Sequence, residues 1–308
     1  MRSMQPMPLY HAAALHTSVI GALPRGWAYV LIPNPRDIES YLKVLTTQRF
    51  TGMAGLNTLY NALLNHPSFG AVDFSQCLLT GAGGMATQKA VADRWRQVTK
   101  LPITEAYGMS EATCYITYSP IDATDFTGSV GLPIPLTDVS IRDDSGAEVA
   151  LGENGEICAR GPQVMAGYWN RPDETAKVMT ADGFLRTGDI GWMDDHGYVR
   201  ISDRKKDMLL VSGFNDFPNE IEGVLAMHPK VIESAVIGRP DEHSGEVPVA
   251  YIVRRDTSLS EEEILAFCRE NLTGYKRPKA VVFIEALPKS AVGKILRRKL
   301  REQSPTLS

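Results

Sequence analysis

The sequence is poor in the residues that build disulfide frameworks and zinc sites. It has 4 cysteines and 6 histidines among 308 residues, and neither type is clustered. The cysteines stand far apart, at Cys77, Cys114, Cys158 and Cys268. Zinc sites and disulfide-rich folds place such residues at short spacings, so the sequence predicts neither. Unpaired cysteines also fit a reducing compartment, and we expect a cytoplasmic protein.

An excess of positive charge and a long apolar run are also missing. Lysine and arginine number 32 against 36 for aspartate and glutamate, which gives a formal net charge of -4. Nucleic acids are therefore not expected as partners, because no basic excess neutralises a phosphate backbone. No apolar run is long enough to span a bilayer. Near the N-terminus, Pro6, Pro8, His11 and His16 interrupt the apolar stretch, which argues against a secretory signal.

The chain is long enough for two domains, and its first part has the pattern of an α/β domain. Between Leu9 and Tyr118, short apolar runs alternate with amphipathic segments, a pattern typical of parallel strands joined by helices. Strands are expected at residues 28–32, 76–80 and 103–106. A helix capped by Asp37 and another through Trp95 and Val98 are expected between them.

The next region has a sequence pattern typical of antiparallel β structure. From Thr127 to Ile201, short strands are separated by turn signals. These turns are Asp144-Ser145-Gly146, Asn154-Gly155, Asp182-Gly183 and His196-Gly197. Closely spaced turns of this kind favour hairpins, so we expect a small, barrel-like β subdomain at about residues 127–201.

The last third predicts a compact α+β domain. A helix is expected near Asn219, and a second helix follows the capping box Ser260–Glu263. The charged stretch Asp203–Asp207 suits a linker better than a core, so we place the domain boundary there. The expected organisation is an α/β large domain over residues 1–203, followed by a small, mobile α+β domain over residues 204–308.

Two segments of the α/β region carry residues suited to binding a nucleotide. The run Thr80–Gly84 follows an expected strand, and its glycines let backbone N–H groups approach an anion. It lacks the Lys-Ser/Thr ending of a P-loop, and a tight strand-to-helix turn explains it equally well. The segment Tyr107–Glu111 lies at the carboxyl end of an expected parallel strand, where ligands bind in open α/β sheets. Its ring can stack on a base and its carboxylate can hold Mg²⁺, while a half-buried aromatic before a helix cap gives the same pattern.

Three further segments carry charge. In Thr187-Gly188-Asp189, a carboxylate on a turn could accept both hydroxyls of a ribose, although a capped turn is the commoner explanation. The run Arg204–Asp207 is ordinarily a solvated face. Lys294 stands beside Gly293 on a loop tip, where a mobile ammonium could reach a phosphate. The basic helix Arg297–Arg301 is expected to face solvent, its charges favoured by the helix dipole.

Taken together and in this order, these segments resemble those of the adenylate-forming superfamily of acyl-CoA synthetases, luciferases and peptide-synthetase adenylation domains. The resemblance extends from Pro8 to Arg301. Its most specific parts are Tyr107–Glu111, Arg186–Asp189, Asp203–Asp207 with Ser212-Gly213-Phe214, and Gly293-Lys294. Five matches in one order leave little room for chance, whereas each alone would be weak.

Within this superfamily the sequence is most similar to bacterial long-chain fatty acid:CoA ligases. The segments that carry this similarity are Gly161–Trp169, Lys205–Phe214 and Asn271–Pro278. The resemblance implies a carboxylate that attacks the α-phosphorus of ATP, giving an acyl-adenylate and pyrophosphate, and a CoA thiol that then displaces AMP. It implies fatty acid, ATP and CoA as substrates and Mg²⁺ as the metal; aryl or shorter-chain acids are the alternative substrates.

The resemblance also implies roles for residues around the nucleotide. Tyr107 would stack on adenine, and Asp189 would bind the ribose hydroxyls with support from Arg204. Ser110 would contact phosphate, and Glu111 would hold Mg²⁺. Three glycines would belong to the same nucleotide and acyl pocket, namely Gly83, Gly84 and Gly108.

Four implied roles belong to the small domain and its boundary. Lys294 would stabilise charge on the α-phosphate during adenylation, and Gly213 would line the pantetheine tunnel. Asp203 and Lys206 would lie at the hinge between the domains. A domain that delivers Lys294 for one step and then rotates would suit a mixed anhydride that must be kept from water until the thiol arrives.

The sequence contains no phosphate-cradling loop ending in Lys-Gly, which the resembled superfamily carries upstream of these segments. We therefore expect the chain to be the C-terminal portion of such a ligase, with an incomplete sheet that favours association of copies or instability. The alternative is a non-catalytic truncated homologue that holds nucleotide or acyl-CoA, or pairs with another subunit. For the helix Arg297–Arg301, attraction to CoA phosphates or to the anionic inner face of a membrane stands beside the solvated-face interpretation.

Overall fold

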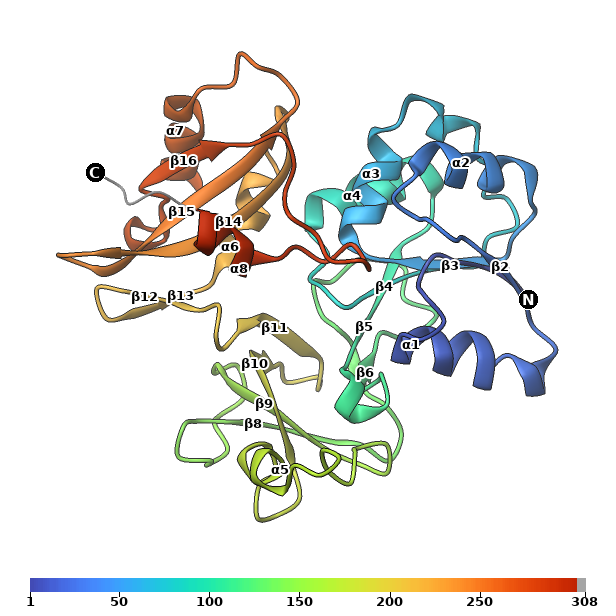
Figure 1. Ribbon diagram of the computed structural model, residues 1–308, viewed down its shortest axis with the longest axis horizontal. Helices are drawn as coiled ribbons and strands as arrows, with labels where there is room; N and C mark the ends of the chain where they lie inside the picture. Colours follow the sequence, from blue (N-terminus) through green and yellow to red (C-terminus); the bar gives the residue numbers. More distant parts are fainter. Residues whose placement is uncertain (304–308) are drawn as a thin grey trace. The chain divides into compact units, whose positions relative to one another are not determined.

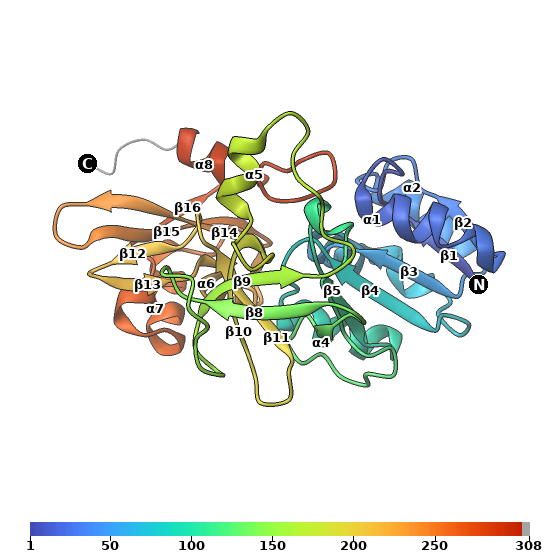
Figure 2. The same ribbon diagram turned by 90° about the horizontal axis from the view of Figure 1, so that it is seen from below.

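A computed structural model describes residues 1–303 as two compact units. The first unit covers Met1–Ile201 and the second begins at Ser202, slightly before the boundary expected at the charged stretch. Each unit has its own sheet or sheets, with helices packed against them (Figures 1 and 2). None of the helices in the described residues is long and apolar enough to cross a membrane.

A seven-stranded sheet forms the centre of the first unit, in the order β2-β1-β3-β4-β5-β6-β7. Its strands are β1 Arg2–Gln5, β2 Ala28–Leu31, β3 Gly52–Gly55, β4 Leu79–Gly83, β5 Ile103–Tyr107, β6 Thr117–Tyr118 and β7 Leu132–Pro133. β1 to β5 pair in parallel, whereas β6 and β7 run antiparallel. The helices are α1 Ala12–Ala14, α2 Ile38–Thr47, α3 Asn57–Asn65 and α4 Lys89–Thr99, with the short segments η1 Leu15–Ile20, η2 Leu23–Arg25, η3 Pro67–Ala71 and η4 Ser110–Ala112. The expected α/β class is confirmed.

Aromatic side chains fill the space between this sheet and its helices. The rings of Tyr60 and Trp95 meet edge to face, 4.6 Å apart, and the Trp95 indole N–H donates to the hydroxyl of Thr80 at 3.2 Å. Tyr41, on the predicted inner face of α2, is fully buried. The helix begins where expected, because the Asp37 carboxylate accepts the N–H of Ser40 at 3.0 Å. Burying each such ring contributes about 2–3 kcal/mol, so these contacts hold the helices on the sheet.

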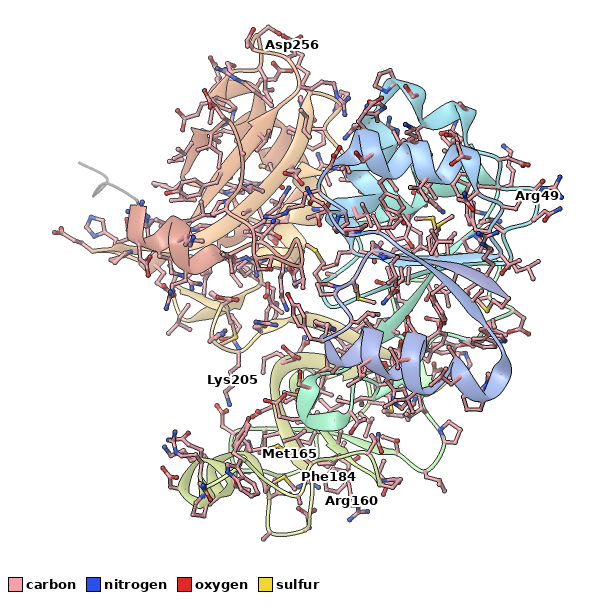
Figure 3. The ribbon with its side chains drawn as sticks, turned by 45° about the vertical axis from the view of Figure 1, so that its right-hand side comes forward. Arg49, Arg160, Met165, Phe184, Lys205 and Asp256 are labelled. Carbon is pink, nitrogen blue, oxygen red and sulfur yellow. The ribbon has the colours of Figure 1, made fainter. Side chains whose placement is uncertain are left out.

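The β-rich subdomain is a four-stranded antiparallel sheet in the order β11-β10-β9-β8. Its strands are β8 Asp138–Arg142, β9 Gly155–Arg160, β10 Leu185–Met193 and β11 Val199–Arg204, with the helix α5 Pro172–Val178. Within the described residues β8 is an edge of this sheet, whereas Val199 of β11 also forms an antiparallel bridge with Gly131, next to β7 of the seven-stranded sheet. The barrel-like closure stays a prediction, because closure depends on strand number and stagger, which turn signals do not specify. The guanidinium of Arg160 lies over the Phe184 ring at 4.4 Å (Figure 3).

The second unit is the expected α+β fold. Its sheet has the order β13-β12-β15-β14, and β16 adds to β15. The strands are β12 Leu209–Val211, β13 Phe214–Asp216, β14 Val231–Asp241, β15 Gly245–Arg254 and β16 Ala280–Phe283, and the helices are α6 Pro218–Leu225, α7 Glu261–Asn271, η5 Gly274–Lys276 and α8 Arg297–Gln303. The predicted cap of α7 is formed, because the Ser260 hydroxyl accepts the N–H of Glu263 at 3.1 Å. Apolar clusters bury both sides of β14 and β15.

Candidate functional site

The carboxyl end of β5 meets a turn of β10 in the first unit. Tyr107, the last residue of β5, is 7% exposed. Its hydroxyl donates to the carboxylate of Asp189 at 2.7 Å. Two segments singled out separately in the sequence are thus joined at a sheet edge where α/β proteins bind ligands.

The position of Asp189 is fixed by a β-bulge in β10. Pairing with β9 shifts register between Arg186 and Ile190, and Gly188 adopts φ +72° within this bulge. The buried Glu156 accepts the Arg186 guanidinium at 2.7 Å and the N–H of Gly188 at 3.1 Å. The ordinary capped turn is also present, because the N–H of Asp189 donates to the Thr187 hydroxyl at 3.2 Å. Glu156 was not predicted as a site residue from the sequence, because only the pairing of β9 with β10 brings it to the Gly188 bulge.

The segment after Tyr107 folds back on itself within a few residues. The N–H of Ile116 donates to the Tyr107 carbonyl at 2.8 Å, closing a loop that contains η4. A Cβ at Gly108 would lie 1.8 Å from the carbonyl oxygen of Cys114, so only glycine fits there. Ser110 lies exposed at the start of η4, and Glu111 follows it.

Glu111 is held by Tyr168, a residue to which the sequence motifs assign no role. The Tyr168 hydroxyl donates to Glu111 Oε1 at 2.9 Å. The N–H of Met165 donates to the Glu111 carbonyl at 2.7 Å (Figure 3 labels Met165). Tyr168 lies within Gly161–Trp169, a segment noted only for its family similarity, and nothing in the spacing indicates this contact.

The carboxylate chemistry at Glu111 fits one mode of magnesium binding. No group of three or more His, Cys, Asp or Glu side chains that could hold a metal occurs in residues 1–303. Mg²⁺ is commonly held by one or two carboxylates together with substrate phosphates and water. Glu111 therefore fits as a single protein ligand for Mg²⁺ that arrives with a nucleotide.

The glycine-rich run is not the turn that the sequence predicted. Residues 80–83 belong to β4 itself, and the expected strand at residues 76–80 is shifted toward the C-terminus. A Cβ at Gly83 would approach the Ala106 carbonyl oxygen to 2.9 Å, so the small residue permits close packing of β4 against β5. Gly84, with φ +81°, makes the turn. The two glycines thus lie at the same sheet edge as Tyr107.

Glu105, two residues before Tyr107 in β5, carries a buried carboxyl group. Glu105 is 6% exposed and accepts the N–H of Thr87 at 3.3 Å. Burial raises the pKa of Glu105 to about 7, against its ordinary 4.5. The folded state therefore holds a proton that the unfolded state releases between these two values.

This shift predicts that the first unit loses stability as pH rises from 4.5 to 7. Because the folded-state pKa lies above the unfolded one, the loss grows through this window to about 3 kcal/mol and is constant above it. Glu105→Gln is expected to abolish this part of the pH dependence. Urea unfolding at several pH values measures it by tryptophan fluorescence, since all 4 tryptophans precede residue 202. Parallel pH profiles for the parent and the variant would contradict the assignment.

Lys294 lies on a short hairpin of the second unit. Lys289 and Ile295 form a β-bridge, and Gly293 turns the chain with φ +85°. The Ser290 hydroxyl accepts the N–H of Lys294 at 3.1 Å, and the Ser290 N–H donates to the Lys294 carbonyl at 2.8 Å. The expected loop tip is therefore an ordered turn.

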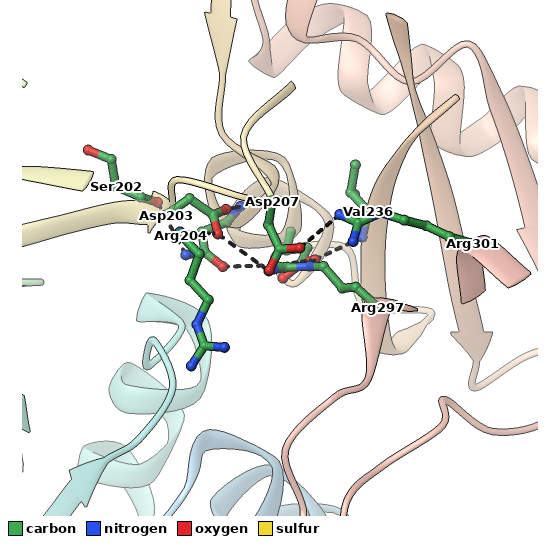
Figure 4. A network of polar contacts seen from close by, with 9 residues as sticks. Ser202, Asp203, Arg204, Asp207, Val236, Arg297 and Arg301 are labelled. Atoms are coloured by element: carbon green, nitrogen blue, oxygen red, sulfur yellow. Dashed lines mark hydrogen bonds and ion pairs between the residues drawn. The ribbon is translucent and has the colours of Figure 1, made fainter. Parts of the chain in front are cut away.

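The charged stretch at the boundary is folded into the second unit, contrary to the expectation of a solvated linker. Asp203 is 1% exposed and accepts the N–H of Asn219 at 2.9 Å, and Asp207 is also buried. Both carboxylates are within ion-pair distance of Arg297 (Figure 4). The stretch is polar because its carboxylates pair with an arginine far away in the sequence. A pattern of neighbouring residues cannot reveal such a pairing.

Three other predicted site residues of the second unit lie in or just after this stretch. Arg204 ends β11, and Lys206 is exposed in the turn that follows. Gly213, with φ +83°, lies in the tight turn between β12 and β13. Each unit thus contains its own subset of the predicted site residues: Gly83, Gly84, Tyr107, Gly108, Ser110, Glu111 and Asp189 in the first, and Asp203, Arg204, Lys206, Gly213 and Lys294 in the second.

Comparison with known families identifies both parts of the chain. Residues 1–169 match the family described as AMP-binding enzyme, and residues 220–294 match the AMP-binding enzyme C-terminal domain. The chain belongs to the AMP-binding enzyme family. The resemblance derived from the ordered motifs is thereby confirmed.

Relatives of this AMP-binding enzyme chain include named ligases. It is 53% identical over 297 residues to a long-chain-fatty-acid–CoA ligase of Yersinia pestis, and 49% identical over 298 residues to one of Escherichia coli O157:H7. The alignments cover 96% and 97% of this chain but 53% of each relative. The chain thus spans about half the length of the curated relatives it matches.

Solved structures of the same kind superimpose on the chain. ATP-bound MatB from Rhodopseudomonas palustris gives a TM-score of 0.89 at 31% identity, over 98% of this chain and 59% of that one. The anthranilate CoA ligase AuaEII in complex with anthranoyl-AMP gives 0.90 at 29% identity, over the same shares.

Proposed function

We propose that the protein ligates a long-chain fatty acid to coenzyme A through an acyl-adenylate made from ATP. The observation that carries this proposal is the hydrogen bond between Tyr107 and Asp189 at the carboxyl end of β5, with Glu111 four residues further on. The names of the Yersinia and Escherichia relatives support the fatty acid and CoA as substrates.

In this proposal the first unit binds the nucleotide. Asp189, rigid in its bulge, accepts hydrogen bonds from the ribose hydroxyls, and Tyr107 contacts the adenine. Ser110 donates to a phosphate oxygen, and the glycines Gly83, Gly84 and Gly108 allow the nucleotide and the acyl group to approach the backbone. Glu111 holds Mg²⁺, which neutralises phosphate charge when it is bound.

The second unit supplies the movable charge. Lys294 stabilises the negative charge that develops as the fatty acid carboxylate attacks the α-phosphorus and the bond to pyrophosphate breaks. The thiol of CoA then attacks the acyl carbon, loses its proton and releases AMP, with the pantetheine arm passing Gly213. Rotation about Asp203 and Lys206, with Arg204 beside the ribose, lets one unit serve both steps.

ATP–pyrophosphate exchange with a panel of carboxylic acids tests the proposal. It would be run on this 308-residue chain and on a fusion that places it behind the corresponding N-terminal part of the Yersinia relative. Exchange by the fusion that requires a long-chain acid is the expected result. Preference for aryl or short acids would change the substrate, and nucleotide binding without exchange in either protein would favour a non-catalytic binding module.

The contact between Tyr168 and Glu111 predicts a weaker magnesium site in Tyr168→Phe. Outer hydrogen bonds orient a ligating carboxylate, and losing one typically weakens metal affinity by about 10-fold or more. The Mg²⁺ concentration that gives half-maximal exchange should rise accordingly, and saturating Mg²⁺ should restore the rate. Binding of Mn²⁺ to the nucleotide complex, followed by electron paramagnetic resonance, gives a readout without turnover. Equal metal dependence in both proteins would remove Tyr168 from this role.

A further inference from the structure

The hairpin that carries Lys294 is anchored on both of its arms. On the first arm, the Lys289 ammonium pairs with both carboxylate oxygens of Glu233 in β14 at 2.7 Å. The second arm runs into α8, whose first residue is Arg297. The side chain of Arg297 is 14% exposed, so it points into the unit and not toward solvent.

Arg297 contacts two separate segments, α6 and the boundary stretch Asp203–Asp207, with one planar guanidinium. Its Nε and one terminal nitrogen donate to Glu222 of α6 at 3.2 and 2.8 Å. The same terminal nitrogen donates to the Asn219 side-chain oxygen at 2.9 Å. The other terminal nitrogen reaches Asp203 at 3.4 Å and lies 3.6 Å from Asp207 (Figure 4). This fork geometry is specific to arginine, because a lysine ammonium is a point charge.

The basic residues of α8 do not all lie on one solvent-exposed face. The expectation of a solvent-facing helix is wrong for Arg297, whereas Arg301 is exposed as expected but also donates to Asp207 at 2.8 Å. Arg298 is 83% exposed and pairs with Glu302, in the next turn of α8. The charge that could attract CoA phosphates or an anionic membrane is therefore smaller than the sequence suggested.

Electrostatics explains why Arg297 is needed once these carboxyls are buried. Burial raises the pKa of Glu222 and of Asp203, and the positive charge of Arg297 opposes both shifts. Buried ion pairs of this kind seldom add net stability, because desolvation offsets the attraction. The ion pairs of Arg297 are better explained by geometry, since each contact fixes the distance between two segments of the unit.

We propose that Arg297 is a positioning residue that couples the Lys294 hairpin to the boundary segment Asp203–Asp207, so that movement at the boundary is transmitted to Lys294. This proposal rests on the role given to Lys294 in the proposed function. Asp203 lies on the boundary strand and Arg297 lies three residues after Lys294, so the guanidinium is the direct link between them. Without the fork, the hairpin keeps its Lys289–Glu233 anchor, and α8 keeps the contact between Arg301 and Asp207.

The test is Arg297→Lys in the fusion protein, with Arg298→Lys as the matched control. Acyl-adenylate formation and thioester formation from supplied acyl-adenylate would be measured separately. A misplacement of about 1 Å can cost about 100-fold in rate, so we expect adenylation kcat to fall by about 10- to 100-fold. The KM for ATP and the thioester step should change less than about 3-fold, and the control should match the parent. Equal loss in both half-reactions with a lowered melting temperature, or no loss at all, would overturn the positioning role.

Amide hydrogen exchange in the 308-residue chain supplies a readout that needs no catalysis. The N–H groups of Gly293, Lys294 and Leu296 are hydrogen-bonded within the hairpin. Faster exchange at these amides in Arg297→Lys, but not in Arg298→Lys, is expected, and unchanged exchange would contradict the proposal. If the parent fusion makes no acyl-adenylate, the proposed function fails while this measurement still decides the role of Arg297.

Discussion

Replacement of Lys294 by alanine is expected to lower the rate of acyl-adenylate formation by about 100- to 1000-fold. Removing one donor that stabilises charge in a transition state typically costs this much, about 3–4 kcal/mol. The hairpin around Lys294 is held by hydrogen bonds of the Ser290 backbone and hydroxyl and by the Lys289–Glu233 pair, so the truncated side chain should leave the turn intact. The loss should appear in kcat, because the charge acts on the reacting phosphate and not on the binding of adenine or ribose.

The second half-reaction provides the internal control for this variant. Thioester formation from supplied acyl-adenylate and CoA needs no new charge on the α-phosphate, so its rate in Lys294→Ala should stay within about 2-fold of the parent. Lys299→Ala removes an exposed lysine from the same segment and should leave both rates unchanged. Equal losses in the two half-reactions would show that Lys294 supports the fold or CoA binding, and would sink its assignment to adenylation.

Features set by neighbouring residues were predictable from the sequence. Asp37 and Ser260 cap their helices as expected, because a cap is decided within four residues. The parallel sheet followed from the alternation of apolar runs and amphipathic helices, although only β2, β4 and β5 of its five parallel strands had been expected. The strand β4 was misplaced by a few residues, because its small residues are chosen for contact with β5 and not for local propensity.

Contacts between distant segments lay beyond local patterns. Tyr107 and Asp189 are 82 positions apart, and each had an ordinary structural explanation in its own window. Arg297 and Asp203 are 94 positions apart; Arg297 had been placed on a solvated helix face and Asp203 in a polar linker. The two side chains can be buried because their opposite charges lie close together in the fold. The residues next to either one in the sequence do not predict this pairing. The ordered set of motifs pointed to the family, whereas the partners of each motif required the structure.

The loop after Tyr107 gives the largest expected effect on stability. Gly108→Ala should destabilise the first unit by about 3 kcal/mol, since overpacking commonly costs 1–3 kcal/mol and here the clash is with backbone. The added Cβ would lie 1.8 Å from the Cys114 carbonyl oxygen and 2.9 Å from Cα of Tyr115, and neither atom can rotate away. Cys114 already adopts φ +89°, a conformation that few non-glycine residues take, so the loop has little freedom to adjust.

Urea unfolding of the 308-residue chain measures this cost, and tryptophan fluorescence restricts the signal to the first unit. Gly70→Ala is the matched control, because nothing lies within 4 Å of its added Cβ and its backbone needs no positive φ. That variant should unfold at the same urea concentration as the parent or slightly above it, since alanine restricts the unfolded chain. If Gly108→Ala unfolded like Gly70→Ala, the loop would be pliable, and Ser110 and Glu111 would not be held by the fold where the nucleotide phosphates are proposed to lie.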